Sequence, residues 1–290
     1  MRWWFVGSRS AQSAATLETL LRQGVVPDGV FIDGPDYSGS IAQGVIPPLI
    51  RPDVSPGALE LAATQGIAAT SGSPTQLQQL VQGNRPERVL VSCYPHRISR
   101  LLLTAVPQGW LNIHPSLLPA YRGINPVFWQ LRDGHDSIGV TLHRMNEIFD
   151  QGPIIDQCRF SLADFPDYGM INRRVGQYGA QLFLAYLENS RQEAVEGVAQ
   201  DALVGSRQGP PQERDFAVDP DWSAQRLIRF VRGVRGLATP FLVDRAAGKL
   251  LIEDAAFANE ARLAAPLPGK RLIHCYDGNV LLQILGEESE

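Results

Sequence analysis

Residues 88–123, RVLVSCYPHRISRLLLTAVPQGWLNIHPSLLPAYRG, alternate between strand-like and helix-like patterns. The apolar run RVLVSCY (88–94) predicts a buried strand, residues 98–105 have helical spacing, and WLNIHPS (110–116) predicts a second strand. A strand, a crossover helix and a strand in this order are typical of a parallel sheet.

The same alternation extends in both directions from this segment. Upstream, strands are predicted over 3–8, 29–34 and 66–72, with helices over 11–23, 57–65 and 75–82. Downstream, the patterns predict a helix over 126–132, strands over 139–145 and 153–162, and a long amphipathic helix over 167–189. Residues 1–204 are therefore predicted to form an α/β domain with a Rossmann-like, mostly parallel sheet.

The remainder of the chain has a different character. Residues 205–220 are rich in Gly, Pro, Gln and charge, which predicts a linker. Beyond it, 221–233 predicts a capped helix, and short strand-like pieces follow, with an Asp-Gly hairpin signal in CYDGN (275–279). Residues 221–290 are predicted to form a small β-rich, barrel-like domain resembling an OB fold.

Composition limits the classes of function. The net charge of −4 is not that of a typical nucleic-acid binder, and only Lys249 and Lys270 are lysines. No apolar stretch approaches the roughly 20 residues that cross a bilayer, so no membrane partner is expected. The three cysteines are far apart, which predicts reduced thiols in a cytoplasmic protein, and no metal-ligand spacing is present.

Three polar residues at predicted strand ends suggest a reaction centre. Asn112 and His114 are two apart, so on a strand both side chains leave the same face. Asp150 follows in the turn-like stretch FDQGP between two further predicted strands. An amide, an imidazole and a carboxylate are the groups that hold, polarise and deprotonate the partners of an acyl transfer, although a single histidine is more often a loop or core residue.

The pattern NIHPSLLPAYRG followed by GVTLHRMNEIFDQGPII (139–155) resembles the folate-dependent formyltransferase family. That family includes enzymes acting on glycinamide ribonucleotide, methionyl-tRNA, amino sugars and hydroxyornithine. The resemblance covers roughly the first 190 residues, and the small second domain resembles that of the methionyl-tRNA and some small-molecule enzymes. It implies 10-formyltetrahydrofolate as co-substrate, no metal, and Asn112, His114 and Asp150 as the catalytic residues.

The resemblance also implies which residues contact the folate. One set occupies the place of the segment that lines the pterin pocket, although it departs from the more apolar family pattern: Tyr94, Pro95, His96, Arg97 and Ile98. A second set matches the loop that lies along the folate: Ser116, Leu117, Leu118 and Pro119. The backbone from Met145 to Asp150 is expected to meet the pterin ring.

The chemistry follows from the residue types. A neutral amine attacks the formyl carbon, and the resulting oxyanion accepts hydrogen bonds from Asn112 and His114. Loss of one such donor typically costs about 100- to 1000-fold in rate. Asp150 near His114 favours the protonated imidazole, and the pair passes a proton from the amine to the folate nitrogen.

Other residues are weaker candidates. Tyr121 and Arg122 follow the SLLP motif directly and are expected to touch substrate, whereas Trp129 either contacts substrate or packs its helix. His143 is interpreted as structural. An arginine run at spacing three (Arg226, Arg229, Arg232, Arg235) is interpreted as a solvated helix face partly paired with carboxylates, because residues 205–290 hold 11 Lys/Arg against 12 Asp/Glu.

Several functions stay open at this stage. The first is formyl transfer to a small-molecule amine such as an amino-sugar nucleotide or N-hydroxyornithine. Methionyl-tRNA is possible but disfavoured, since residues 36–60, where the tRNA enzymes carry a basic loop, contain Arg51 as the only basic residue. Hydrolysis of 10-formyltetrahydrofolate and a non-catalytic folate-binding module are further alternatives. The second domain is expected to shape the acceptor site, form a homodimer contact or bind a second ligand.

Overall fold

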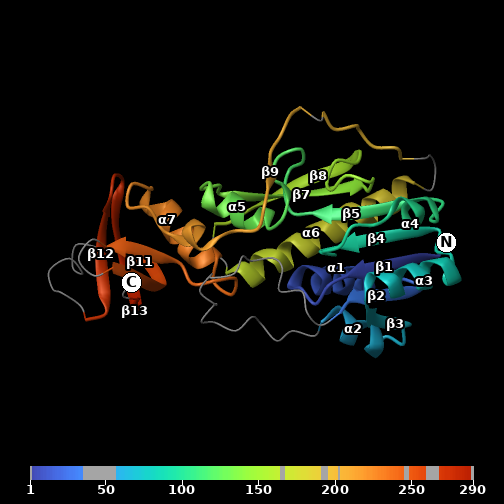
Figure 1. Ribbon diagram of the computed structural model, residues 1–290, viewed down its shortest axis with the longest axis horizontal. Helices are drawn as coiled ribbons and strands as arrows, with labels where there is room; N and C mark the ends of the chain where they lie inside the picture. The colour runs from blue at the N-terminus through green and yellow to red at the C-terminus, as the bar shows by residue number, and fades with distance from the viewer. Residues whose placement is uncertain are drawn as a thin grey trace.

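The computed structural model describes residues 2–34, 57–163, 167–190, 195–201, 203–244, 248–258 and 268–288. A seven-stranded sheet and its helices form the larger part of an elongated molecule, and a four-stranded sheet forms the other end (Figure 1). The Rossmann-like α/β class and the β-rich second domain are both confirmed.

The large sheet has the strand order β3-β2-β1-β4-β5-β7-β8. Its strands are β1 Trp3–Gly7, β2 Gly29–Asp33, β3 Ala69–Gly72, β4 Arg88–Ser92, β5 Trp110–His114, β7 Ser137–Arg144 and β8 Ile154–Ser161. The pairs among β1 to β5 are parallel, whereas β5 with β7 and β7 with β8 are antiparallel. The sheet is therefore mostly parallel with an antiparallel edge, as the alternating pattern predicts.

Helices cover both faces of this sheet. They are α1 Ala11–Arg22, α2 Ala58–Thr64, α3 Pro74–Asn84, α4 Arg100–Thr104, α5 Pro126–Arg132 and α6 Tyr168–Asn189. Side chains alternate along β1: Trp3 and Phe5 join the apolar cluster that contains α1, α2 and α6, while Trp4 and Val6 join the one that contains α3 and α4. This period of two is what a strand buried on both faces requires.

Predicted element boundaries hold to within a few residues. The long helix begins at Tyr168 because Asp167 is its N-cap and its carboxylate accepts a hydrogen bond from Met170 N at 2.8 Å. The helix predicted from residue 98 begins at Arg100, where the Ser99 side chain caps it. The strand predicted over 66–72 begins only at Ala69.

The second domain consists of helix α7 Ala224–Gly233 and a sheet of order β10-β11-β13-β12. Its strands are β10 Phe241–Asp244, β11 Gly248–Phe257, β12 Lys270–Cys275 and β13 Gly278–Glu288. The hairpin between β12 and β13 is present, with Tyr276 and Asp277 as its turn, one residue earlier than the Asp-Gly signal. Over the described residues this is a four-stranded antiparallel sheet, and its closure into a barrel stays a prediction.

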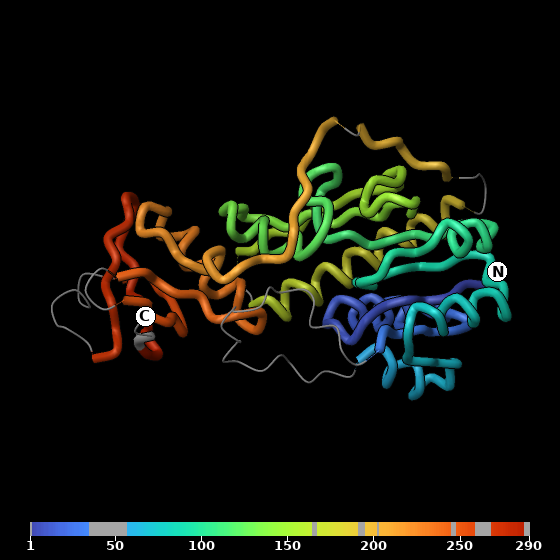
Figure 2. Tube along the Cα trace, in the orientation of Figure 1, coloured from blue at the N-terminus to red at the C-terminus, as the bar shows by residue number. Residues whose placement is uncertain are grey.

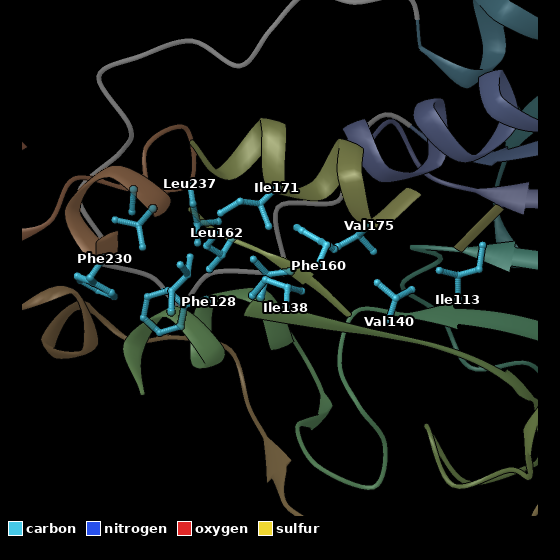
Figure 3. Packing of buried hydrophobic residues seen from close by; sticks show 14 of the residues in the cluster. Ile113, Phe128, Ile138, Val140, Phe160, Leu162, Ile171, Val175, Phe230 and Leu237 are labelled. Carbon is cyan, nitrogen blue, oxygen red and sulfur yellow. The ribbon is translucent and has the colours of Figure 1, made fainter. Parts of the chain in front are cut away.

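The segment predicted as a linker is packed against the catalytic domain. Its strand β9 Arg207–Gln208 pairs with β6 Arg122–Gly123, and the 3₁₀ helix η1 Glu213–Phe216 follows. The ring of Phe216 is buried 4.7 Å from that of Phe128. In Figure 3 buried side chains form a row from Ile113 to Phe230, so one apolar core continues from the large sheet into α7.

Candidate active site

A cavity of about 670 Å³ opens at the carboxyl ends of the central strands. Residues at or just after the ends of β1, β4 and β5 line it, among them Ser8, Cys93 and His114. After β1 the chain continues to β2 on one side of the sheet, and after β4 it continues to β5 on the other side. The carboxyl ends of β1 and β4 are therefore the topological switch point, where α/β proteins bind ligands. The wall is completed by the start of α6 and by Arg235, Gly236 and Leu237 from the second domain.

Asn112 and His143 are cross-strand partners on β5 and β7. Nδ1 of His143 lies 2.8 Å from the Arg144 carbonyl, which can only accept, so Nδ1 carries the hydrogen and Nε2 accepts from Nδ2 of Asn112 at 3.1 Å. Complete burial lowers the pKa of His143 to about 4, because burial disfavours the charged imidazolium. A neutral His143 therefore fixes the orientation of the Asn112 amide.

His114 is held at both ring nitrogens. Nε2 donates to the carbonyl oxygen of Tyr121 at 2.9 Å, and Nδ1 lies 3.5 Å from Oδ1 of Asp150. Both ring nitrogens thus face oxygens of the protein, and donation from His114 to an oxyanion stays a prediction. Nδ1 is the nitrogen that faces the carboxylate of Asp150.

Asp150 occupies a strained turn between β7 and β8. Its φ of 59° lies in the left-handed region, which a non-glycine residue adopts only when its surroundings hold it there. Oδ2 accepts a hydrogen bond from Gly123 N at 2.8 Å, and Oδ1 lies 3.8 Å from Nε2 of His143. Asn112, His114 and Asp150 are thus brought together, as the strand-end argument predicts, with both His114 and Asp150 buried.

Residues 53–187 match the family model described as formyl transferase. The methionyl-tRNA formyltransferase of Chloroflexus aurantiacus is 32% identical over 228 residues, which cover 79% of this chain and 71% of that protein. The chain belongs to the formyltransferase family. It is a transferase of the folate-dependent type, as the NIHPSLLP and DQGPII motifs indicated.

Other formyltransferases match over different extents. The GDP-perosamine N-formyltransferase of Brucella melitensis is 32% identical over 152 residues, 51% of this chain and 57% of that protein. The crystal structure of an N-formyltransferase from Helicobacter canadensis with folinic acid and dTDP-3-aminofucose shares the fold, with a TM-score of 0.65 at 16% identity over 98% of this chain and 100% of that one. HypX from Aquifex aeolicus in complex with tetrahydrofolic acid gives a TM-score of 0.65 at 18% identity, covering 97% of this chain and 43% of that one.

Most of the predicted pterin segment of this formyltransferase lies at the cavity. Tyr94, Ile98 and Met145 belong to the apolar cluster beside α4, and all three line the cavity with Pro95 and Arg97. The Tyr94 hydroxyl is buried without a hydrogen-bond partner among the described residues, and burial, reinforced by Asp33, raises the pKa of this phenol. His96 is outside the cavity lining, with Nε2 2.9 Å from Oδ1 of Asp33.

The SLLP loop lies behind the cavity wall. The Ser116 hydroxyl donates to Ala120 O at 2.7 Å, and Leu118 N donates to Oγ1 of Thr141 at 3.1 Å. The peptide bond between Leu118 and Pro119 is cis. None of Ser116, Leu117, Leu118 and Pro119 belongs to the cavity lining, so their predicted contact with the folate has no support from this placement.

The three predicted substrate residues also lie outside the lining. The Tyr121 hydroxyl donates to Oδ2 of Asp133 at 2.7 Å, and Nε1 of Trp129 donates to Gly209 O at 3.0 Å. Arg122 is 4% exposed and its guanidinium donates to oxygens of residues 200, 201 and 204. Their side chains are committed to packing and loop anchoring, so substrate contact is not supported for them.

Sequence reasoning missed several residues at the cavity. His143 was interpreted as structural, although its pairing with Asn112 follows once 110–114 and 139–145 are recognised as antiparallel neighbours. A further part of the cavity lining comes from residues distant in sequence: Asp167, Tyr168, Gly169, Asn172, Arg207, Gln208, Arg235, Gly236 and Leu237. No local motif marks these residues, because only the packing of α6, β9 and α7 assembles them.

The arginine run on α7 is not a solvated face. Arg226 donates to Arg132 O, and Arg229, 6% exposed, donates to the carbonyls of Gly134 and His135 at the end of α5. Only the expected carboxylate pairing is confirmed, in the contacts of Arg232 and Arg235 with Asp254. The first two arginines therefore join the second domain to the catalytic domain.

The described residues contain neither a cluster of metal-ligating side chains nor a membrane-spanning helix. No group of three or more His, Cys, Asp or Glu side chains is arranged there to hold a metal ion. No helix in this part of the chain has the length and apolar character needed to cross a membrane.

Proposed function

We propose that this chain transfers the formyl group of 10-formyltetrahydrofolate to the amine of a small molecule, and that the acceptor is an amino-sugar nucleotide. The observation that carries the proposal is the contribution of the second domain to the wall of the cavity. Arg235, Gly236 and Leu237 form one wall, so the acceptor reaches Asn112 and Asp150 through a space of about 670 Å³. That volume is typical of small-molecule sites.

The charges around the cavity support an anionic acceptor. Arg9, at the start of α1, and Arg207, on β9, both line it and both are exposed. The N-terminus of α1 adds main-chain N–H groups beside Arg9, which can bind an anion. A nucleotide diphosphate would match these groups, and the GDP-perosamine N-formyltransferase among the relatives acts on a substrate of this class.

The second domain offers little to a tRNA. Arg226 and Arg229 donate to main-chain carbonyls of the catalytic domain, and Arg232 and Arg235 contact Asp254. Phosphate contacts supply most of the affinity for nucleic acids, so these arginines have little to contribute. The stretch 36–60, which argued against tRNA from sequence, lies outside the described residues over 36–56.

Asn112 is suited to stabilise the tetrahedral centre. The carboxamide nitrogen has two hydrogens, and His143 accepts one of them, which leaves the second for the oxyanion that forms on the formyl oxygen. Because neutral His143 fixes the amide, little reorganisation is needed as charge develops.

Asp150 and His114 are suited to move the proton. The amine nitrogen forms a bond to the formyl carbon and loses a proton to Asp150, directly or through an intervening water. His114 donates at Nε2 to Tyr121 O, so Nδ1 is the position that shares this proton with Oδ1. Return of the proton to the folate nitrogen accompanies cleavage of its bond to carbon, which gives tetrahydrofolate and the N-formyl product.

A panel of acceptors tests the proposal. Release of tetrahydrofolate would be measured with GDP-perosamine, dTDP-3-aminofucose, N-hydroxyornithine and methionyl-tRNA, and without an acceptor. We expect the highest kcat/KM for an amino-sugar nucleotide. Highest activity with N-hydroxyornithine or methionyl-tRNA would overturn the proposed acceptor.

Methionyl-tRNA is the second candidate, because its formyltransferases match most of this chain. Acceptor affinity measured at rising salt concentration distinguishes methionyl-tRNA from an amino-sugar nucleotide. Each phosphate contact steepens the loss of affinity, so a steep loss would indicate the tRNA. Formate release at the same rate with and without an acceptor would instead indicate a hydrolase.

A further inference from the structure

Gln200 lies against the main chain on both sides of the Asp150 turn. Its Nε2 donates to Asp150 O at 2.9 Å and to Gly152 O at 2.7 Å. Gln200 belongs to residues 195–201, which follow α6 and are drawn in yellow-orange along the upper edge of Figure 2. This segment contacts the turn again where Val198 and Ile154 exchange main-chain hydrogen bonds of 2.7 and 2.8 Å.

Arg122 determines which way the Gln200 amide points. Nε and Nη2 of Arg122 donate to Oε1 of Gln200 at 3.1 and 2.9 Å. A guanidinium has only donors, so Gln200 must present its oxygen to Arg122 and its NH₂ group to the turn. Further bonds to Val204 O and Asp201 O, at 3.2 and 3.1 Å, hold the buried guanidinium in place.

The residues on either side of Arg122 contact the two groups proposed to transfer the proton. Tyr121 O accepts from His114, and Gly123 N donates to the Asp150 carboxylate, so the residues on both sides of Arg122 touch the two partners of the proton transfer. The route from Gly123 through Asp150 and Gln200 to Arg122 is therefore a closed ring of bonds. Such a ring fixes the carboxylate relative to His114 Nδ1.

The turn needs this support. Asp150 has a left-handed backbone, and a Cβ added at Gly152 would overlap the carbonyl oxygen of Arg144, so the chain is tightly constrained there. We propose that Gln200 is a positioning residue, which holds Asp150 at its distance from His114, and that Arg122 keeps the Gln200 amide in the required orientation. The proposal rests on the proton-transfer role proposed for Asp150.

The substitution Gln200→Glu tests the positioning role of Gln200. A glutamate keeps an oxygen for Arg122 but cannot donate the hydrogen bonds to Asp150 O and Gly152 O. Hydroxylamine serves as the probe nucleophile, because it is small enough to reach the site whatever the natural acceptor is. We expect kcat to fall about 10- to 100-fold, the cost of a misplaced reacting group, with the KM for 10-formyltetrahydrofolate unchanged.

A second readout does not depend on turnover. The ¹⁵N shifts of the His114 ring report the partner at Nδ1, and we expect Gln200→Glu to move them in the same direction as Asp150→Asn. Gln79→Glu, at an exposed position on α3, is the matched control and should change neither readout. Binding of folinic acid, followed by tryptophan fluorescence, shows that each variant is folded.

The outcomes are distinct. Wild-type kcat and unchanged His114 shifts in folded Gln200→Glu, with Asp150→Asn inactive, would overturn the positioning role alone. Equal activity of Asp150→Asn and wild type would overturn the role of Asp150 itself. A fall in kcat that is matched by lost folinic acid binding would reduce Gln200 to a structural residue.

Discussion

The main-chain N–H of Gly123 donates a 2.8 Å hydrogen bond to Oδ2 of Asp150, across 27 residues of sequence. This bond leaves Oδ1 facing the two histidines, 3.5 Å from His114 and 3.8 Å from His143. One oxygen is therefore an anchor and the other is available for chemistry. The division explains why the carboxylate keeps a fixed direction in a turn that has no regular secondary structure.

Asp150→Asn should lower kcat for formyl transfer about 100-fold or more, the usual contribution of a general base. Asparagine has nearly the same shape but cannot take up the proton. Folinic acid affinity should be retained, because the carboxylate is not needed to fill the pterin pocket. Steady-state kinetics and fluorescence titration measure the two quantities. Asp156→Asn, exposed on β8, is the control, and full turnover by Asp150→Asn would contradict the mechanism.

His143 should make the folded protein sensitive to mild acid. Its pKa is lowered from 6.5 to about 4, so the unfolded chain binds this proton at a higher pH than the folded chain does. The stability associated with neutral His143 is therefore complete above pH 6.5 and is lost as the pH falls towards about 4. The full effect is about 3 kcal/mol, at about 1.4 kcal/mol for each unit of pKa shift.

Urea unfolding of wild type and His143→Gln across this pH range measures the effect. The advantage of wild type over the variant should shrink as the pH falls, because glutamine does not titrate. His274→Gln, at an exposed position on β12, is the control for replacing a histidine by glutamine. A constant difference between wild type and His143→Gln would show that folding does not lower the pKa of His143.

The large sheet and part of the candidate site could be predicted from the sequence. Asn112 and His114 share a face because strands have a period of two, and Asp150 follows a recognisable turn. The pairing of Asn112 with His143 depends on the register of two antiparallel strands, which no local pattern specifies. Arg122 illustrates the same limit: an arginine beside the SLLP motif suggested a substrate contact, yet its partners lie 78 or more residues away.

The second domain was predicted as β-rich, and a contribution to the acceptor site was one of three roles left open for it, without the residues that would make it. A segment rich in Gly and Pro predicts a linker, and burial of Phe216 in it is visible only when α5 and α7 come together. The spacing of the α7 arginines predicted a solvated helix face. Sequence spacing cannot show that main-chain carbonyls at the end of another helix accept hydrogen bonds from two of them. Tertiary contacts of this kind account for most of what the sequence did not predict.

Arg229→Ala should destabilise the protein by about 2 kcal/mol, since two charge-assisted hydrogen bonds to Gly134 O and His135 O are lost from a buried site. Arg232→Ala removes a partly exposed pair with Asp254 and should cost under about 1 kcal/mol. Thermal or urea unfolding compares the two variants. Equal losses would show that Arg229 does not join the two domains.

Gly176→Ala should destabilise the protein by about 1–3 kcal/mol, the cost of overpacking. A Cβ at this position would overlap Gln12 O and approach Thr16 N to 2.9 Å, so α1 and α6 would have to separate. Gly83→Ala is the matched control: it lies in α3 with no atom within 4 Å of an added Cβ, and it should stabilise by about 0.5–1 kcal/mol.

Separation of α1 and α6 should also disturb the cavity around Asn112. Gln12 donates to Ser92 Oγ and Ile113 O, each at 3.2 Å, which links the start of α1 to β4 and β5 beside Asn112. We therefore expect Gly176→Ala to lower kcat as well as stability, whereas Gly83→Ala leaves kcat at the wild-type value. Wild-type kcat in Gly176→Ala, measured well below its unfolding temperature, would show that the α1–α6 contact stabilises the fold without positioning the site.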